Sequence, residues 1–424
     1  MTRLLIAILA LALTSCYEPM DVDEIAEMYV ATELMMARHD PAHVDAYFGP
    51  DEVKEHAEES ALSLDEILKL SQMLQSLLST VETQDDEMLA LRVNGLMARL
   101  KALDTRIAIN QGEHLDFDAE SLALFGSQAP HYDAAHFQGI LDQIDAVLPG
   151  DGPLSKRVEA FNNQFVIELD KLPAVFEAAM AECRRRTKEH IELPEGESFT
   201  IEYVNDKPWS GYNWYQGNAQ SLIQVNTDFP IYISRAVDLG CHEGYPGHHT
   251  FNALLEANLA KGQGWIEFSL YPLFSPQSLI AEGSGNYGID LAFPGSERMA
   301  FEKEVLFPLA GLDAVDADLY YEIHGLIAQL NFAGNEAARA YLNGTWTREE
   351  AAQWLQDYAM SREDKSLQRT RFFDAYRSYV INYNHGKALV ADYVERGAPD
   401  IEERWARFEK LLSSPLLPSD LLEN

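Results

Sequence analysis

The sequence predicts a mainly α protein with a small β-sheet directly before a histidine-rich helix. Apolar residues recur with helical spacing through most of the chain, and Ser63 and Thr347 are each followed three residues later by Glu, a pattern typical of helix starts. Alternation with period two is confined to a short stretch near residues 199–225. Helices therefore form the bulk of the expected fold.

The first half of the chain is expected to be helical throughout. Ser63 and Glu66 form a capping box. The helix that they begin has apolar residues three and four positions apart, at Leu64, Ile67, Leu68, Leu74, Leu77, Leu78 and Val81. Residues 88–103 and 154–188 form further amphipathic runs.

Strands are expected in the middle of the chain, and helices resume after residue 240. Residues 199–203 and 221–225 have strand length and strand composition, with an aromatic, Gly-containing stretch at 209–215 between them. Thr347 begins a later helix, and residues 361 to about 394 are expected to form another.

The first fifteen residues predict a targeting segment. Arg3 gives a positive start, and residues 4–13 form an apolar run too short to span a bilayer. Residues 13–16 (Leu-Thr-Ser-Cys) resemble a bacterial lipobox, in which Cys16 is lipidated and becomes the mature amino terminus. Because Tyr17 rather than aspartate follows Cys16, an inner-membrane retention signal is missing. We expect a lipid-anchored protein of the bacterial cell envelope, held in the outer membrane and facing the periplasm.

Composition limits the partners and the domain organisation. The chain has 68 acidic and 32 basic residues and a formal charge of −36, so we expect no nucleic-acid partner, because phosphate binding needs basic surface. No Gly/Ser-rich or Pro-rich linker divides the chain. A helical region at 16–195 is expected to pack on a region at 196–424 as one continuous fold, 16–424. Besides Cys16 there are Cys183 and Cys241, for which a disulfide and free buried thiols both remain open.

Residues 242–249 (His-Glu-Gly-Tyr-Pro-Gly-His-His) carry the chemistry of the chain. Imidazole and carboxylate are the ligands of catalytic zinc, and a carboxylate that is not a ligand can accept the proton of the water that the metal activates. The run is close to H-E-x-x-H, but Pro246 occupies the position of the second histidine. A proline there predicts a kink or bulge. If the bulge takes up two residues, His248 replaces the usual ligand, and His249 is the alternative.

A third ligand is expected further along the chain. Glu282 is flanked by apolar residues, and a buried carboxylate is usually paired or bound to a metal. The small residues that follow Glu282 would let another backbone approach. Asn286 and Asp238 are candidates for the partners that metal-bound histidines require.

These residues carry a family resemblance. His-Glu-x-x-Pro-Gly-His followed by Glu-Gly-x-x-x-Tyr resembles the bacterial domain of unknown function 885 family, which is grouped with zincin-type, glutamate-ligand metallopeptidases. Residues 38–41 and 46–50 are similar to the amino-terminal segment of that family, and residues 376–379 and 383–387 to its carboxy-terminal segment. The resemblance implies a mostly helical, zincin-type metallopeptidase fold. It places His242, His248 and Glu282 on zinc and makes Glu243 the general base.

The resulting hypothesis is a lipid-anchored, zinc-dependent metallopeptidase that binds one zinc ion per chain and hydrolyses peptide substrates. Tyr383 is the candidate donor to the oxyanion. An extended peptide could be held against an edge strand of the small sheet. Two alternatives stay open. One is a metal-dependent amide or ester hydrolase that acts on an envelope component, and the other is a lipid-anchored binding or scaffold protein with a degenerate site.

Overall fold

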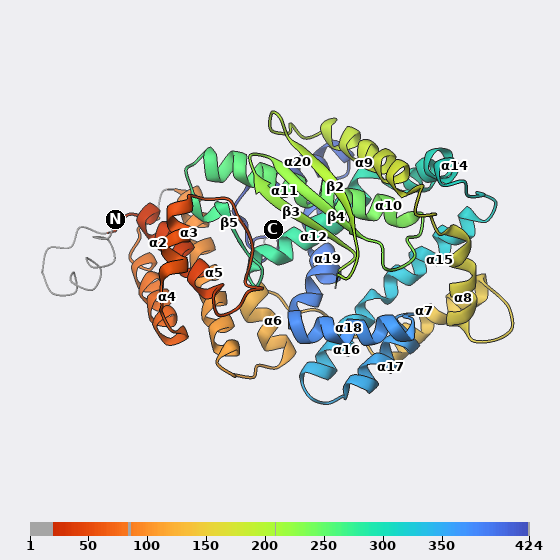
Figure 1. The fold of residues 1–424 in the computed structure, drawn as a ribbon, viewed down its shortest axis with the longest axis horizontal. Helices are drawn as coiled ribbons and strands as arrows, with labels where there is room; N and C mark the ends of the chain where they lie inside the picture. The colour runs from red at the N-terminus through yellow and green to blue at the C-terminus, as the bar shows by residue number, and fades with distance from the viewer. Residues whose placement is uncertain (1–19, 84–85, 208, 423–424) are drawn as a thin grey trace, which may run out of the picture.

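The computed structural model describes residues 20–83, 86–207 and 209–422 (Figure 1). The expected targeting segment and Cys16 lie outside these ranges. Helices dominate and the strands form two small sheets, which confirms the predicted fold class. In the part of the chain that the structure describes, no helix is long and apolar enough to cross a membrane.

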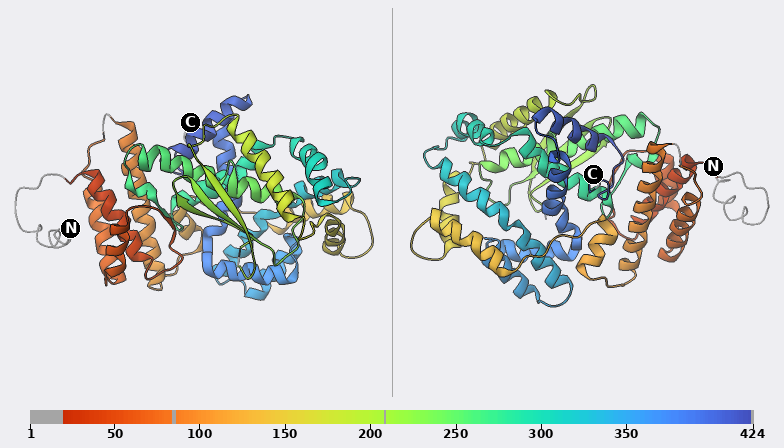
Figure 2. Two further views of the ribbon diagram at one scale, coloured as in Figure 1. Left: turned by 45° about the horizontal axis from the view of Figure 1, so that its top comes forward. Right: turned by 180° about the vertical axis from the view of Figure 1, so that it is seen from behind.

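Four amino-terminal helices gather at one end of the molecule (Figures 1 and 2). They are α2 (Val22–Met36), α3 (Asp51–Glu59), α4 (Leu64–Leu78) and α5 (Glu87–Asn110). The capping box of Ser63 and Glu66 is present at the start of α4. The apolar face of α4 is buried through Ile67, Leu74 and Leu78, so the predicted periodicity corresponds to one core-facing side.

The predicted helical run at 154–188 is two helices. The elements of this part are α6 (Phe117–Phe125), α7 (Ala134–Val147), α8 (Leu154–Asn162), η2 (Asn163–Phe165) and α9 (Leu172–Lys188). Pro173 lies in the first turn of α9, where a backbone N–H would have no helical partner, so its absence is tolerated. In the interior of one continuous helix the same proline would remove a hydrogen bond and break the helix. Between them the chain passes through η2, a β-bridge from Val166 to Tyr232 and a turn at residues 169–171.

The main sheet directly precedes the histidine-rich segment, as predicted. It consists of β2 (Ser198–Val204), β3 (Gly211–Gly217) and β4 (Gln220–Asn226) in the order β2-β4-β3. β2 is parallel to β4, and β3 is antiparallel to it in the register Trp214↔Leu222. The aromatic stretch expected between two strands is therefore itself the edge strand β3. A second sheet pairs β1 (Val44–Tyr47) with β5 (Leu270–Pro272) and joins the amino-terminal helices to the rest of the chain.

Helix α12 (Pro276–Ala292) passes through the centre of the fold and is buried along most of its length. The elements between β4 and α12 include α10 (Ser234–Leu239), η3 (Gly240–Gly244), α11 (His248–Leu255), η4 (Glu256–Lys261) and η5 (Ile266–Ser269). Gly283 of α12 meets Gly386 of α19 (Ile381–Glu395), where a Cβ on Gly283 would lie 2.5 Å from the Gly386 carbonyl oxygen. The small residues after Glu282 thus let a second backbone approach, as the sequence predicted.

The carboxy-terminal half completes the helical body. Its elements are α13 (Glu297–Phe301), η6 (Glu302–Leu306), α14 (Phe307–Ala310), α15 (Ala317–Gln329), η7 (Leu330–Phe332), α16 (Ala333–Leu342), α17 (Arg348–Tyr358), α18 (Glu363–Tyr376), η8 (Arg377–Val380), α19 (Ile381–Glu395) and α20 (Ile401–Ser413). Thr347 caps α17, as predicted.

The helix expected from 361 to about 394 is broken in two at Arg377, which has a φ of +52°. Glu120 stabilises the break. Its carboxylate accepts hydrogen bonds from the side chain of Arg377 at 2.6 Å and from the Ser378 backbone N–H at 3.1 Å. The break turns α19 back against α12.

Candidate metal centre

The histidine-rich segment is an interrupted helix. α10 runs into a π-helical turn, η3, that contains His242, and regular structure stops at residues 245–247 before α11 begins at His248. Gly247 closes the interruption, because its N–H donates to the Cys241 carbonyl at 2.9 Å. A Cβ at Gly247 would lie 1.9 Å from the His242 carbonyl oxygen, so this position requires glycine. The bulge predicted from Pro246 is present.

The interruption brings His242 and His248 together, and α12 adds Glu282. The ring centroids of the two histidines are 4.6 Å apart. Glu282 Oε2 lies 3.3 Å from His242 Nε2 and 3.8 Å from His248 Nε2. One donor atom from each of the three residues falls within 4.8 Å of the others. The three predicted ligands thus converge from three separate elements, η3, α11 and α12.

The donor atoms suit a bound cation. Glu282 Oε1 accepts a hydrogen bond of 2.8 Å from the Tyr379 hydroxyl, whereas Glu282 Oε2 is buried without a hydrogen bond to any described residue. Burial raises the pKa of Glu282, but His242, His248 and Tyr379 outweigh that effect and hold the pKa below its usual value. Burial lowers the pKa of His248 to about 4. Burial acts on His242 in the same way, but Glu282 and Glu243 outweigh it and raise the pKa of His242. An ionised carboxylate and a neutral imidazole are the forms that bind zinc.

Glu243 lies beside this cluster and is 4% exposed. Burial raises the pKa of the Glu243 carboxyl to about 7. Strand β3 covers it, because a Cβ on Gly211 would lie 2.9 Å from Glu243 Oε1. Asn213, also on β3, donates a hydrogen bond of 2.6 Å to the Glu243 carbonyl oxygen. The edge strand therefore lies directly against the residue predicted to be the general base.

Tyr383 reaches the same region from α19. Its ring centroid is 5.8 Å from that of Tyr379, whose hydroxyl binds Glu282. The Tyr383 side chain is half-buried, and its hydroxyl makes no hydrogen bond within the described ranges. The negative charges of Glu282 and Glu243 both act on it.

His249, the alternative second ligand, faces away from the cluster. It is fully buried, with Nδ1 2.8 Å from Ser221 Oγ and Nε2 3.3 Å from Glu197 Oε2. Glu197 is also held by Arg184 and Tyr245. His249 therefore ties α11 to the strands behind the site.

The two expected histidine partners have other contacts. Asp238 pairs with Arg298 at 2.8 Å and with Arg235 at 3.4 Å. Asn286 donates to the Tyr383 carbonyl oxygen at 3.1 Å and so joins α12 to α19. Neither one orients His242, whose Nδ1 makes no hydrogen bond to the described residues. Gly285 leaves room for that ring, since a Cβ there would lie 2.9 Å from Nδ1.

Sequence reasoning missed Asp45 and the role of Tyr379. Asp45, on β1, accepts a hydrogen bond from the Tyr212 hydroxyl, and its charge acts on Glu243 and Glu282. Burial raises the pKa of Asp45 to about 6. The signal in the sequence was the neighbouring segment 46–50, which resembles the amino-terminal segment of the domain of unknown function 885 family.

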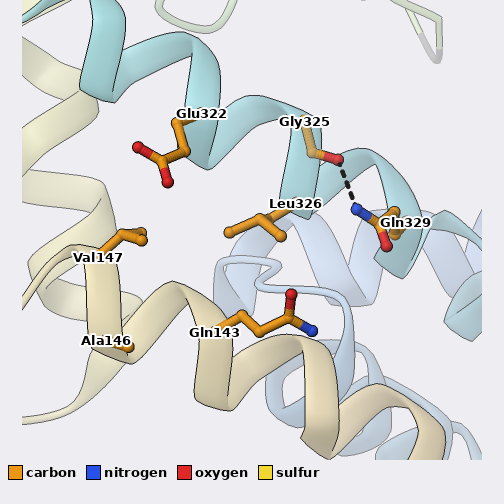
Figure 3. A pocket seen from close by; sticks show the side chains of 7 residues that line it. All are labelled: Gln143, Ala146, Val147, Glu322, Gly325, Leu326 and Gln329. Atoms are coloured by element: carbon orange, nitrogen blue, oxygen red, sulfur yellow. Dashed lines mark hydrogen bonds between the residues drawn. The ribbon is translucent and has the colours of Figure 1, made fainter.

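A shallow pocket elsewhere does not belong to this centre. It lies between α7 and α15 (Figure 3). Its lining residues are Gln143, Ala146, Val147, Glu322, Gly325, Leu326 and Gln329. None of them is a member of the metal cluster, and a single carboxylate among amides and apolar side chains gives no catalytic set.

Fold and site together define a mainly helical protein with a buried His-His-Glu cluster that could hold a metal ion. No family model matches the chain, and no curated protein matches it. Among solved structures, it is similar to a candidate lipoprotein from Colwellia psychrerythraea, with a TM-score of 0.53 and 14% identity over 85% of this chain and 68% of that one. That likeness shows a shared fold.

Two metallocarboxypeptidase structures are more distant. The M32 carboxypeptidase from Deinococcus radiodurans R1 has a TM-score of 0.47 and 12% identity, over 95% of this chain and 93% of that one. Trypanosoma cruzi metallocarboxypeptidase 1 has a TM-score of 0.46 and 16% identity, over 95% and 94%. The resemblance to the domain of unknown function 885 family therefore stays a prediction.

Proposed function

We propose that this chain is a zinc-dependent metallopeptidase in which His242, His248 and Glu282 hold one zinc ion. The observation that carries the proposal is the convergence of three donor atoms within 4.8 Å, one of them a buried carboxylate oxygen that has no hydrogen bond to a described residue. Two imidazoles and a carboxylate are the protein ligands of a hydrolytic zinc site. When bound, the ion would polarise the substrate carbonyl and lower the pKa of water.

Glu243 is the proposed general base. It follows the ligand His242 directly and is buried, and a pKa near 7 lets the carboxylate accept a proton at neutral pH and return it to the leaving amine. The hydroxyl of Tyr383 is the proposed donor to the oxyanion, because it is close to the cluster and has no hydrogen bond to a described residue. Strand β3 is placed to position an extended substrate beside Glu243.

We also propose that the enzyme is anchored in the cell envelope by a lipid on Cys16. The lipobox-like sequence supports this anchoring, and the similar fold of the Colwellia psychrerythraea protein, itself described as a candidate lipoprotein, agrees with it.

The test is Glu243→Gln, assayed on a mixed peptide library beside the wild type and Glu322→Gln, a control far from the cluster. We expect Glu243→Gln to lose at least about 10³-fold in kcat/KM, as for loss of a general base, while both variants keep one zinc per chain. Substantial activity in Glu243→Gln would overturn the mechanism. A wild-type chain that takes up no zinc would overturn the proposed function.

A further inference from the structure

Two cations on one face of α18 have no carboxylate partner. Lys365 and Arg369 lie one helical turn apart, and neither forms an ion pair with any described residue. Lys365 Nζ donates to the neutral Gln368 side chain at 3.2 Å. The Arg369 guanidinium rests against Phe372 and Phe373, with its Cζ 4.9 Å and 5.8 Å from the ring centroids. This is unusual in a chain with a formal charge of −36.

Arg369 is connected to the metal centre by a row of aromatic rings. The ring of Phe372 contacts the Arg369 guanidinium, and its centroid lies 6.4 Å from the ring centroid of Tyr383. Tyr383 is 5.8 Å from Tyr379, and the Tyr379 hydroxyl binds Glu282. Arg369 is thus linked to the proposed ligand Glu282 through Phe372, Tyr383 and Tyr379, and its charge acts on Tyr383.

Lys365 contacts the segment that precedes the histidine-rich helix. Its Nζ lies 2.8 Å from the ring centroid of Phe229, in the loop that leads from β4 into α10. On α10, Arg235 lies two turns before His242, and its charge acts on Lys365, His242 and Glu243. We call Lys365 and Arg369 on α18, together with Arg235 on α10, the cationic face, and of the three Arg235 alone has a carboxylate partner among the described residues, Asp238.

We propose that this cationic face binds a carboxylate of the substrate beside the bond that is cut. The inference rests on the proposed peptidase function and names the substrate class. A half-buried guanidinium without an anionic partner carries a cost in free energy, which a bound carboxylate would offset. Arginine binds a carboxylate in bidentate fashion, and the second cation adds charge. The carboxylate has two sources, the carboxyl terminus of a peptide or an acidic side chain.

Binding to the catalytically silent Glu243→Gln protein tests the proposal directly. Four acetylated tripeptides serve as probes in calorimetry: Ala-Ala-Phe acid, Ala-Ala-Phe amide, Ala-Ala-Glu amide and Ala-Ala-Gln amide. We expect an anionic probe to bind about tenfold or more tightly than its neutral partner, as for a hydrogen bond to a charged group. Preference for the Phe acid over its amide identifies the terminal carboxylate, and preference for Glu over Gln identifies the side chain.

The preference is then measured in double variants. Arg369→Gln and Lys365→Gln, each added to Glu243→Gln, should reduce the preference for the anionic probe, so that the anionic and neutral probes bind within about twofold of each other. Arg371→Gln, an exposed control on the same helix, should keep it. Arg369→Gln should unfold at the same temperature as its parent or higher, because it removes an unpaired charge. Equal binding of anionic and neutral probes, or a preference that survives both substitutions, would overturn the proposal.

The same data separate this inference from the proposed function. If the wild type cleaves no peptide but Glu243→Gln prefers the anionic probe and loses that preference in Arg369→Gln, the carboxylate site stands and the peptidase proposal fails. If the wild type cleaves the acids and amides equally well and Glu243→Gln shows no preference, the peptidase stands and the carboxylate site fails.

Discussion

The hydroxyl of Tyr379 donates a hydrogen bond of 2.8 Å to Glu282 Oε1. Because this oxygen is held, the other one, Oε2, faces His242 and His248. Tyr379 comes from η8, directly after the break at Arg377, so the break that Glu120 stabilises also sets the direction of the third proposed ligand. A partner of this kind usually fixes the orientation of a metal ligand.

Tyr379→Phe should therefore weaken zinc binding while leaving the ligands in place. We expect a loss of about 10- to 100-fold in zinc affinity, measured by competition with a chromophoric chelator. Tyr376→Phe is the matched control, since Tyr376 contacts the Tyr379 ring but its hydroxyl binds no described residue. Equal zinc affinity in both variants would show that the hydrogen bond does not position Glu282.

His248→Ala should lose zinc binding, whereas His249→Ala should lose stability. His248→Ala removes a proposed ligand, so we expect less than about 0.1 zinc per chain with near-normal stability of the metal-free protein. His249→Ala leaves Ser221 and Glu197 without a buried partner, so we expect a loss of about 2–4 kcal/mol in the free energy of unfolding, while the folded chain keeps its zinc. Metal analysis measures the zinc bound by each variant, and urea unfolding in chelator measures the stability of each metal-free variant. Zinc loss in His249→Ala but not in His248→Ala would make His249 the ligand in place of His248.

The disulfide between Cys183 and Cys241 should stabilise the segment that carries His242. It joins α9 to η3 and closes a loop with a sequence separation of 58. Chain entropy predicts about 4 kcal/mol for a loop of this length. Replacing both cysteines by alanine should lower the free energy of unfolding by about that amount, measured by denaturation beside the wild type. Reductant should destabilise the wild type but not the double variant. Equal stability of the two would show that the bond is not formed.

The convergence of His242, His248 and Glu282 could be predicted because most of its determinants are local. His242, Glu243 and His248 lie in one short motif. Pro246 and Gly247 indicate the bulge that brings His242 and His248 together. Glu282 is distant in sequence but stands out as a carboxylate in an apolar, glycine-containing helix. The physical requirement for neutral imidazole and ionised carboxylate then narrows the choice of ligands.

The other features of the fold and site depend on contacts between segments that are distant in sequence. The spacing of apolar residues carries no information about such contacts. The break between α18 and α19 needs Glu120, which lies 257 residues from Arg377. Asp45 reaches the site because β1 pairs with β5 across the chain. The pairing of Cys183 with Cys241 follows from the packing of α9 against η3, and a count of cysteines could not decide it.

Acid should destabilise the protein partly through His385. Its Nε2 lies 2.8 Å from Ser127 Oγ, and burial lowers the pKa of His385 from 6.5 to about 4. Between these values the unfolded chain binds a proton on this histidine and the folded chain does not. The free energy of unfolding is therefore unaffected by His385 above about pH 6.5. It falls as the pH drops from 6.5 to 4, by up to about 1.4 kcal/mol per pH unit.

His385→Gln should remove this slope, because glutamine does not titrate. We expect the variant to lose less stability than the wild type between pH 6.5 and 4, measured by urea unfolding in chelator so that metal release does not contribute. His114→Gln is the control, because the His114 side chain is exposed and forms no ion pair with a described residue. Parallel pH profiles for His385→Gln and the wild type would mean that His385 is protonated in the folded protein, against the burial that the structure gives it.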